Sequence, residues 1–470
     1  MKILVAIANF GTKNAKYFER LLREYRSMAR YKVDIVVLSN IPKDLGSDVE
    51  VIVGCPPTKD PWSFPFRHKK VFSDRLSGYD LFIYSEDDTL ITERNIRGFL
   101  RTVEILPKDE IAGFIRYELD ESGQKYYSTI HSHFHWIPSS VKKVRDYTFA
   151  RFTNDHSACY LLTQEQLGMA IASGGFLVEP HQEKYDLLVT AATDPYTQCG
   201  LTKVICVSHL EDFCLHHLPN QYIGRVGVSS ADLQLQLDAL ISIASNGKAP
   251  DELFKGETAL KQGRWSKSYY EEGVEDLIGM MPSKTKDVLS IGCGRGATEG
   301  ILVEQGMRVT AVPLDSVIGA CAKARGVEIV PSDSEKALDA LSGRSFDCIL
   351  FMNVLEHLPD PVGILSRYAK LLSADGVVLI SVPNFSHIKV WRDLLQGGIT
   401  WRQRYDFEKS RLHFTTMNVV KRWLKRSGIK VVNVVYQYDG PWRRRSELLG
   451  GAFKSLLASK MVIIGKRVRG

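Results

Sequence analysis

Three consecutive acidic residues stand where a strongly apolar segment ends. The stretch YDLFIYSEDD, residues 79–88, runs apolar side chains into Glu86, Asp87 and Asp88. Carboxylates beside a buried strand cost free energy unless hydrogen bonds or a cation compensate them. Three interpretations follow: a solvated turn with Asp88 capping a helix, a site for Mg2+ or Mn2+, or a calcium loop. The spacing D-x-[DN]-x-[DN]-G of a calcium loop is absent, which excludes the third interpretation.

Glu86 and Asp88 are the two members of this triplet that could share one ligand. In an extended segment side chains alternate between two faces, so these two point the same way and Asp87 points the other way. Carboxylate oxygens are preferred ligands of Mg2+ and Mn2+. We therefore predict that Glu86 and Asp88 bind one such ion and that Asp87 supports them.

A second segment combines an apolar run with closely spaced glycines. VLSIGCGRG, residues 288–296, places Gly292, Gly294 and Gly296 after a strand-like stretch and before a helix-like one. Glycines permit a tight turn and a close approach of the backbone to a ligand. The first N–H groups of the following helix are left to bind a polar or anionic group. An ordinary strand–turn–helix connection is the alternative interpretation.

Strand-like and helix-like segments alternate in two separate parts of the chain. KILVAIAN and KVDIVVLSN flank the helix-like AKYFERLLREYRSMAR, a pattern typical of parallel strands joined by covering helices. The acidic triplet follows the strand YDLFIYS, at the carboxyl end where ligands bind in open α/β sheets. The alternation restarts at DVLSIGCGRG. We predict an α/β protein with domains over residues 1–228 and 265–470 and a helical connection over 229–264.

Length and composition fit two globular domains. The chain has 470 residues, of which 44% are hydrophobic and 24% charged, and a formal net charge of +7. Its basic residues are scattered and no basic–aromatic motif of a nucleic-acid-binding module is present, so we expect no nucleic-acid partner. The first apolar run is shorter than the core of a signal peptide, and no segment is long enough to span a bilayer. These features predict a cytoplasmic protein.

The C-terminal part resembles the class I S-adenosylmethionine-dependent methyltransferases. The resemblance rests on VLSIGCGRG, FDCILFMNVLEHLPDP and LLSADGVVLISVPN, followed by RLHFTTMNVVKRWLKRSGIKVVNV. It implies a Rossmann-like domain that binds S-adenosylmethionine, with Gly292, Gly294 and Gly296 under the methionine part and the ribose. Pro313 stands where an acidic ribose ligand is expected, and Asp315 follows it. The other cofactor contacts implied are Asp333 near the adenine and Asn353 at the end of the fourth strand.

The same resemblance places the methyl acceptor beside Glu356 and His357. A hydroxyl acceptor needs orientation toward the methyl group more than a strong base. His357 is a candidate general base because an imidazole can accept a proton near neutral pH, with a helix-capping role as the alternative. EKSRLHFTT resembles the acceptor element of sugar methyltransferases in outline, with altered residues at Glu408 and Arg411. His413 in this element is the predicted acceptor contact, and an exposed helix-start residue is the alternative.

The N-terminal part resembles GT-A glycosyltransferases, through KILVAIANFG, the strand leading into SEDD, and HLEDFCLHHLPNQY. In that fold a divalent metal bridges the diphosphate of a nucleotide-sugar and stabilises the leaving group. The resemblance implies that His216 or His217 completes the metal or diphosphate site; packing or capping is the alternative role for adjacent histidines. For an inverting reaction it implies Asp186 as the catalytic base, with Asp155 as the runner-up.

Together these features predict a bifunctional enzyme of surface-polysaccharide biosynthesis. One domain would transfer sugar from a nucleotide-sugar with Mn2+ or Mg2+, and the other would O-methylate a sugar hydroxyl of a glycan or glycolipid with S-adenosylmethionine. The alternative is a methyltransferase acting on a glycan, lipid or small molecule, with a non-catalytic N-terminal binding module. Residues 441–460, PWRRRSELLGGAFKSLLASK, predict either a peripheral contact with the inner membrane face or a core helix between the last two strands.

Overall fold

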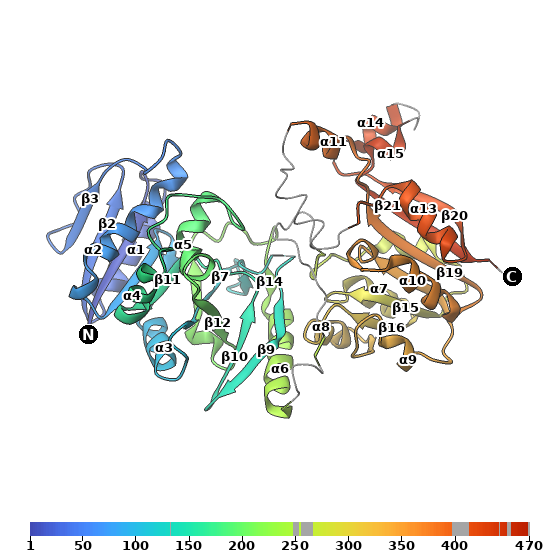
Figure 1. The fold of residues 1–470 in the computed structure, drawn as a ribbon, viewed down its shortest axis with the longest axis horizontal. Coiled ribbons are helices and arrows are strands. Elements are labelled where there is room, and N and C mark those ends of the chain that lie inside the picture. The colour runs from blue at the N-terminus through green and yellow to red at the C-terminus, as the bar shows by residue number, and fades with distance from the viewer. Residues whose placement is uncertain are drawn as a thin grey trace. The chain divides into compact units, whose positions relative to one another are not determined.

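The computed structural model of the chain forms two compact units, residues 1–248 and 249–470 (Figure 1). Each unit has its own sheets and its own buried apolar clusters. Parallel strands with covering helices occur in both, so the α/β class is confirmed. The structure describes residues 1–131, 133–247, 253–254, 267–396, 413–440, 442–448 and 453–468.

The largest sheet of the N-terminal unit has five strands in the order β11-β4-β1-β2-β3. β1 to β4 are parallel, and β11 runs antiparallel to β4. Ile3 to Asn9 of β1 are all buried, as expected for a strand covered on both faces. The strands are β1 (Lys2–Asn9), β2 (Lys32–Ser39), β3 (Val49–Val53), β4 (Leu81–Glu86) and β11 (Cys159–Thr163). The helices of this unit are α1 (Ala15–Arg26), α2 (Arg67–Asp74), α3 (Glu93–Val103), α4 (Gln164–Ala172), α5 (Leu187–Thr197) and α6 (Ser230–Asn246).

Two smaller sheets follow, with the orders β6-β12-β10-β9 and β14-β8-β7-β13-β5. β5 comes directly after the acidic triplet and pairs with β13, so a segment far away in the sequence lies beside the end of β4. The strands are β5 (Thr89–Leu90), β6 (Glu110–Ala112), β7 (Ile115–Leu119), β8 (Lys125–Tyr127), β9 (Trp136–Val144), β10 (Tyr147–Phe152), β12 (Thr202–Cys206), β13 (Cys214–His217) and β14 (Val228–Ser229).

Helix α6 belongs to the N-terminal unit, whereas the sequence predicted it as part of a connection. It contacts β8, β9, β10 and β14. Leu233, Leu237, Leu240 and Ile243 recur at helical spacing and are buried. A free-standing linker would expose this apolar face, whereas α6 packs it against strands of both smaller sheets, and the unit extends to residue 248.

The C-terminal unit contains one sheet of seven strands in the order β17-β16-β15-β18-β19-β21-β20. β21 is antiparallel to both of its neighbours, and the other described pairings are parallel. The carboxyl ends of β15 and the adjacent β18 therefore lie at the same edge of the sheet. The strands are β15 (Asp287–Cys293), β16 (Arg308–Pro313), β17 (Glu328–Ile329), β18 (Phe346–Met352), β19 (Leu372–Pro383), β20 (Ile429–Gln437) and β21 (Lys460–Arg467).

Both faces of this sheet are covered. Along β19, Val378 and Ile380 belong to one apolar cluster, and Val377 and Leu379 belong to another. Because side chains alternate along a strand, the two clusters lie on opposite faces. Among the described helices, none has both the length and the apolar content needed to cross a bilayer. The helices are α7 (Ala297–Glu304), α8 (Gly319–Ala324), α9 (Ala337–Ala340), α10 (Pro361–Tyr368), α11 (Ile388–Leu395), α13 (Met417–Arg426), α14 (Trp442–Leu448) and α15 (Lys454–Leu457).

Candidate functional sites

The glycine turn connects β15 to α7, as the sequence predicts. Gly292 and Gly296 have φ angles of 74° and 79°, in the left-handed region that favours glycine. Gly294 is needed for a different reason: a Cβ there would lie 2.2 Å from the carbonyl oxygen of Tyr269. All three glycines are therefore required by the geometry of the turn.

A segment that precedes the sheet lies across this turn. The Arg295 N–H donates a hydrogen bond to the Tyr269 carbonyl at 2.8 Å. The buried Lys267 ammonium donates to Glu271 at 3.0 Å and to the carbonyl of Met352 at 2.7 Å. These contacts join the segment to both β15 and β18. A pocket at this point is lined by Lys267, Tyr269, Glu271, Met352 and residues 292–299. Lys267 and Glu271 were not predicted, because nothing in their local sequence marks them.

Asn353 directly follows β18 and connects three segments. Its Nδ2 donates to Glu271 at 3.0 Å, and its Oδ1 accepts from the Ser381 hydroxyl at 3.1 Å. Its φ angle is 48°, a left-handed conformation that asparagine adopts more readily than most residues. The structure thus places Asn353 beside the glycine turn, where the sequence analysis expected a cofactor contact.

Glu356 and His357 follow on the next turn of chain and are largely buried. Burial raises the pKa of Glu356 to about 8, and its Oε2 has no hydrogen-bond partner. Burial, together with the nearby Lys267 charge, lowers the pKa of His357 to about 3. At neutral pH the imidazole of His357 is therefore uncharged and Glu356 is largely protonated. This pair can bind an acceptor hydroxyl as hydrogen-bond partners, but His357 is a weak base.

His413 holds the chain in place beside this pair. Its backbone N–H donates to the Glu356 carbonyl at 2.8 Å, and its Nε2 donates to the Leu358 carbonyl at 2.9 Å. One ring nitrogen is thus used by the backbone, which gives His413 a positioning role, and the predicted acceptor contact stays a prediction. Glu408 and Arg411 lie outside the described residues.

The two acidic residues predicted to contact the cofactor cap turns. Asp315 is buried, and its Oδ1 accepts from the N–H groups of Val317 and Ile318 at 2.8 and 2.7 Å. Burial raises its pKa to about 6. Asp333 Oδ1 accepts from two N–H groups at 2.9 Å, those of Glu335 and Lys336. One oxygen of each carboxylate is thus occupied by backbone, and the ribose and adenine contacts stay predictions.

Comparison with known proteins covers this part of the chain. A family model described as a methyltransferase domain matches residues 264–434. The C-terminal unit is a methyltransferase domain. The ubiquinone biosynthesis O-methyltransferase of Xylella fastidiosa (strain 9a5c) is 28% identical over 173 residues, which are 36% of this chain and 70% of that protein. The enzyme of the same name from Xanthomonas axonopodis pv. citri is 28% identical over 166 residues, or 34% and 70% of the two chains. A solved SAM dependent methyltransferase from Archaeoglobus fulgidus has 19% identity, covers 39% of this chain and 87% of its own, and gives a TM-score of 0.30.

Outside the methyltransferase domain, the acidic triplet lies at the end of β4. Asp87 accepts hydrogen bonds from the amides of Asn9 at 2.6 Å and Asn14 at 2.7 Å. Glu86 has a buried Oε1 without a partner, and burial with the adjacent Asp88 charge raises its pKa to about 8. Asp87 is thus held by side chains, and Glu86 is left with an unsatisfied atom. The positive charge of Arg116 favours the ionised form of Glu86 and so opposes this rise in the pKa of Glu86. The Nε of Arg116 is itself buried without a hydrogen-bond partner.

The two histidines of β13 point to opposite sides. His217 Nε2 lies 3.5 Å from Asp88 Oδ2, and its Nδ1 lies 2.6 Å from Glu118 Oε1. Burial lowers the pKa of His217, but hydrogen bonds to Asp88 and Glu118 outweigh it and the net shift is upward. His216 instead stacks on Tyr117 and contacts Asn220, and its role as a metal ligand stays a prediction.

The predicted metal ligands do not assemble completely. Asp88 and His217 come together, but within the described parts of the chain no group of three or more His, Cys, Asp or Glu side chains is arranged to hold a metal ion. Glu118, which was not predicted, takes the second nitrogen of His217 and also accepts from the N–H groups of Gln221 and Tyr222. We therefore assign no step to a metal.

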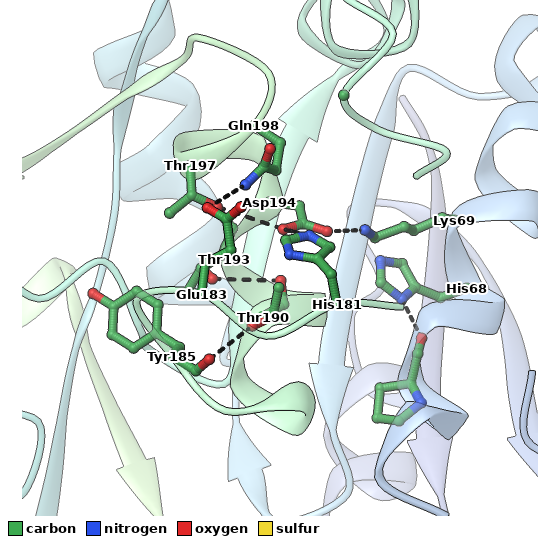
Figure 2. Close-up of polar contacts among 12 residues, drawn as sticks. His68, Lys69, His181, Glu183, Tyr185, Thr190, Thr193, Asp194, Thr197 and Gln198 are labelled. Carbon is green, nitrogen blue, oxygen red and sulfur yellow. Dashed lines mark hydrogen bonds and ion pairs between the residues drawn. The ribbon is translucent and has the colours of Figure 1, made fainter. Parts of the chain in front are cut away.

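Asp186 begins α5, and its Oδ1 accepts from the Val189 N–H at 2.9 Å, so this exposed carboxylate caps the helix. The helix is fixed by a buried ion pair between Lys69 and Asp194, which His181 also contacts (Figure 2). Asp186 is thus the N-cap of α5, and its role as a catalytic base stays a prediction. Asp155, the runner-up, is bound by the Lys184 ammonium at 2.6 Å.

Proposed function

We propose that the methyltransferase domain transfers the methyl group of S-adenosylmethionine to a hydroxyl oxygen of a glycan or glycolipid. The observation that carries the proposal is the position of the buried Glu356 and the partly buried His357, which follow β18 beside the glycine turn at the end of the adjacent β15. The two ubiquinone biosynthesis enzymes named above are O-methyltransferases, which supports oxygen as the acceptor atom.

The residues of this site would act mainly by orientation. S-adenosylmethionine, when bound, supplies an electrophilic methyl group. Lys267, Glu271 and Asn353 fix the chain around the glycine turn, and the neutral imidazole of His357 would accept a hydrogen bond from the acceptor hydroxyl. Holding the oxygen in line with the methyl group lowers the barrier through proximity more than through base strength. His357, with a pKa of about 3, would orient the hydroxyl without holding its proton, which would leave to solvent when the oxygen is methylated.

For the N-terminal unit we propose glycosyl transfer from a nucleotide-sugar, which would make the protein a bifunctional enzyme of polysaccharide biosynthesis. The specific observation in favour is the acidic triplet at the carboxyl end of a parallel strand, facing His217. Covalent linkage would present the product of one site to the other at a high effective concentration. The competing proposal keeps this unit as a binding module that recruits the glycan.

Calorimetry with S-adenosylmethionine, and with a set of nucleotide-sugars in the presence and absence of Mn2+, tests both parts. We expect binding of S-adenosylmethionine by the wild type and by Asp88→Ala, and binding of one nucleotide-sugar by the wild type alone, with the Mn2+ arm deciding whether that binding needs a metal. Absence of nucleotide-sugar binding and turnover in the wild type would leave the binding-module proposal. Failure to bind S-adenosylmethionine would contradict the methyl-transfer proposal. A panel of glycans, glycolipids and small phenols with labelled methyl groups then identifies the acceptor.

A further inference from the structure

Helix α11 exposes apolar side chains along one face. Ile388, Trp391 and Leu395 are 44%, 54% and 85% exposed, while Val390 on the other side is 7% exposed. The spacing i, i+3, i+7 places the three exposed residues on one stripe of the helix. An apolar stripe of this kind on a globular protein marks a surface that contacts something else.

The segment around α15 adds two exposed apolar side chains near α11. Phe453 and Leu456 are 50% and 38% exposed. Two contacts join α14 and α15 to the residues just before α11. The rings of Trp442 and His387 lie 5.5 Å apart, and the Asn384 amide donates to the Ser455 carbonyl at 2.6 Å. Figure 1 shows α11, α14 and α15 together at one end of the C-terminal unit. We call Ile388, Trp391, Leu395, Phe453 and Leu456 the α11/α15 surface.

Exposed basic residues lie on the same three helices. They are Lys389 and Arg392 on α11, Arg443 and Arg444 on α14, and Lys454 on α15. If a second copy of the chain covered the surface symmetrically, these cations would face one another, which is unfavourable. An anionic partner with an apolar interior matches both the charge and the apolar residues.

We propose that the α11/α15 surface docks on an anionic lipid bilayer, with α11 in the plane of the interface. Tryptophan is favoured at that depth, and a short apolar stripe with flanking cations binds peripherally rather than spanning the bilayer. α11 follows β19, whose Ser381 is hydrogen-bonded to Asn353 of the candidate methyl-transfer site. The bilayer would thus lie at the edge of the sheet that carries this site. The inference itself does not depend on which acceptor is methylated.

Sedimentation of the full-length protein with vesicles tests this proposal. We expect binding to vesicles that contain phosphatidylglycerol, and much weaker binding to phosphatidylcholine alone. Leu395→Ser and Trp391→Ser should each lower the partition coefficient about tenfold or more, because burying one large apolar side chain is worth that factor. Arg443→Glu combined with Arg444→Glu should remove the preference for the anionic lipid and its sensitivity to salt.

Trp62→Ser is the matched control, since Trp62 in the N-terminal unit is also 54% exposed. It should bind vesicles like the wild type, and near-ultraviolet circular dichroism checks that each variant is folded. Equal losses in Trp62→Ser and Trp391→Ser, or no vesicle binding by the wild type, would overturn the proposal. So would a concentration-dependent dimer that Trp391→Ser abolishes, because the surface would then be covered by a second copy. None of these measurements requires methyl transfer.

Discussion

The two candidate sites are built in different ways. In the methyltransferase domain, backbone geometry makes the site: the glycine turn is a continuous strand–turn–helix segment, and its steric limits are set by three glycines. In the N-terminal unit, side chains make the site: Asp87 is held by Asn9, and His217 by Glu118, across 78 and 99 positions of sequence. The difference shows that a backbone-built site can be recognised from a local motif, whereas a side-chain-built site depends on contacts that only the fold supplies.

The largest effect is expected at the glycine turn. Gly294→Ala would place a methyl group 2.2 Å from the Tyr269 carbonyl, so the turn must open. We expect loss of measurable S-adenosylmethionine binding in calorimetry and a decrease of about 3–5 kcal/mol in the free energy of unfolding of this domain. Gly279→Ala, where an added Cβ meets nothing within 4 Å, is the control. Equal behaviour of the two variants would contradict a sterically defined site.

Glu356 allows a test by pH. Its folded-state pKa of about 8 lies above the ordinary value of 4.5, so the folded state binds the proton more tightly than the unfolded state. The contribution of Glu356 to the free energy of unfolding is therefore greatest below pH about 4.5. It declines above that pH and is lost once the pH has risen through about 8. Glu356→Gln should be more stable than the wild type by about 3 kcal/mol at pH about 7, with little difference at pH about 4. Urea unfolding at both pH values measures this, and parallel curves for the two proteins would contradict it.

A smaller effect is expected in the side-chain-built site. Glu118→Gln removes the charge that faces His217 and should lower the free energy of unfolding by about 2 kcal/mol. Because the folded-state pKa of His217 is raised, the contact between Glu118 and His217 contributes most to the free energy of unfolding below pH about 6.5. This contribution declines when the pH exceeds the raised pKa. The loss should therefore be greater at low pH. Glu211→Gln, at a surface ion pair with Lys125, is the control and should change stability by less than about 0.5 kcal/mol. Similar losses in both variants would mean that the Glu118 contact is an ordinary ion pair.

The smallest effect separates a cap from a catalytic base. Asp186→Ala should cost about 1 kcal/mol through loss of the α5 cap, measured by thermal unfolding, and should leave nucleotide-sugar turnover within about twofold. Asp186→Asn keeps a capping oxygen and should restore the stability. If both variants abolish turnover while Asp186→Asn is fully stable, then Asp186 acts in the reaction.

Much of the fold was predictable because local patterns determine it. The apolar runs that became β1, β2 and β4 and the turn between β15 and α7 need no knowledge of distant residues. The triplet was placed correctly at a strand end for the same reason. α6 was misassigned because its apolar face identifies a helix but not the sheet that covers it.

The remaining site residues could not be predicted because their roles come from partners elsewhere in the chain. Glu118 lies in an ordinary strand sequence and becomes important only because β13 brings His217 beside it. Asp186 and Asp315 look like free carboxylates in the sequence, but nearby backbone N–H groups bind them. Adjacent histidines look equivalent until strand alternation turns only one toward the acidic residues.

The contact between Tyr269 and the glycine turn determines where the chain can be divided. The residues from Lys267 to Glu271 lie outside the sheet, yet they close one side of the pocket through Arg295, Met352 and Asn353. A recombinant fragment that starts at the first strand of the domain would lack this wall. Any upstream domain joined to this one, by design or by gene fusion, therefore needs its junction before Lys267.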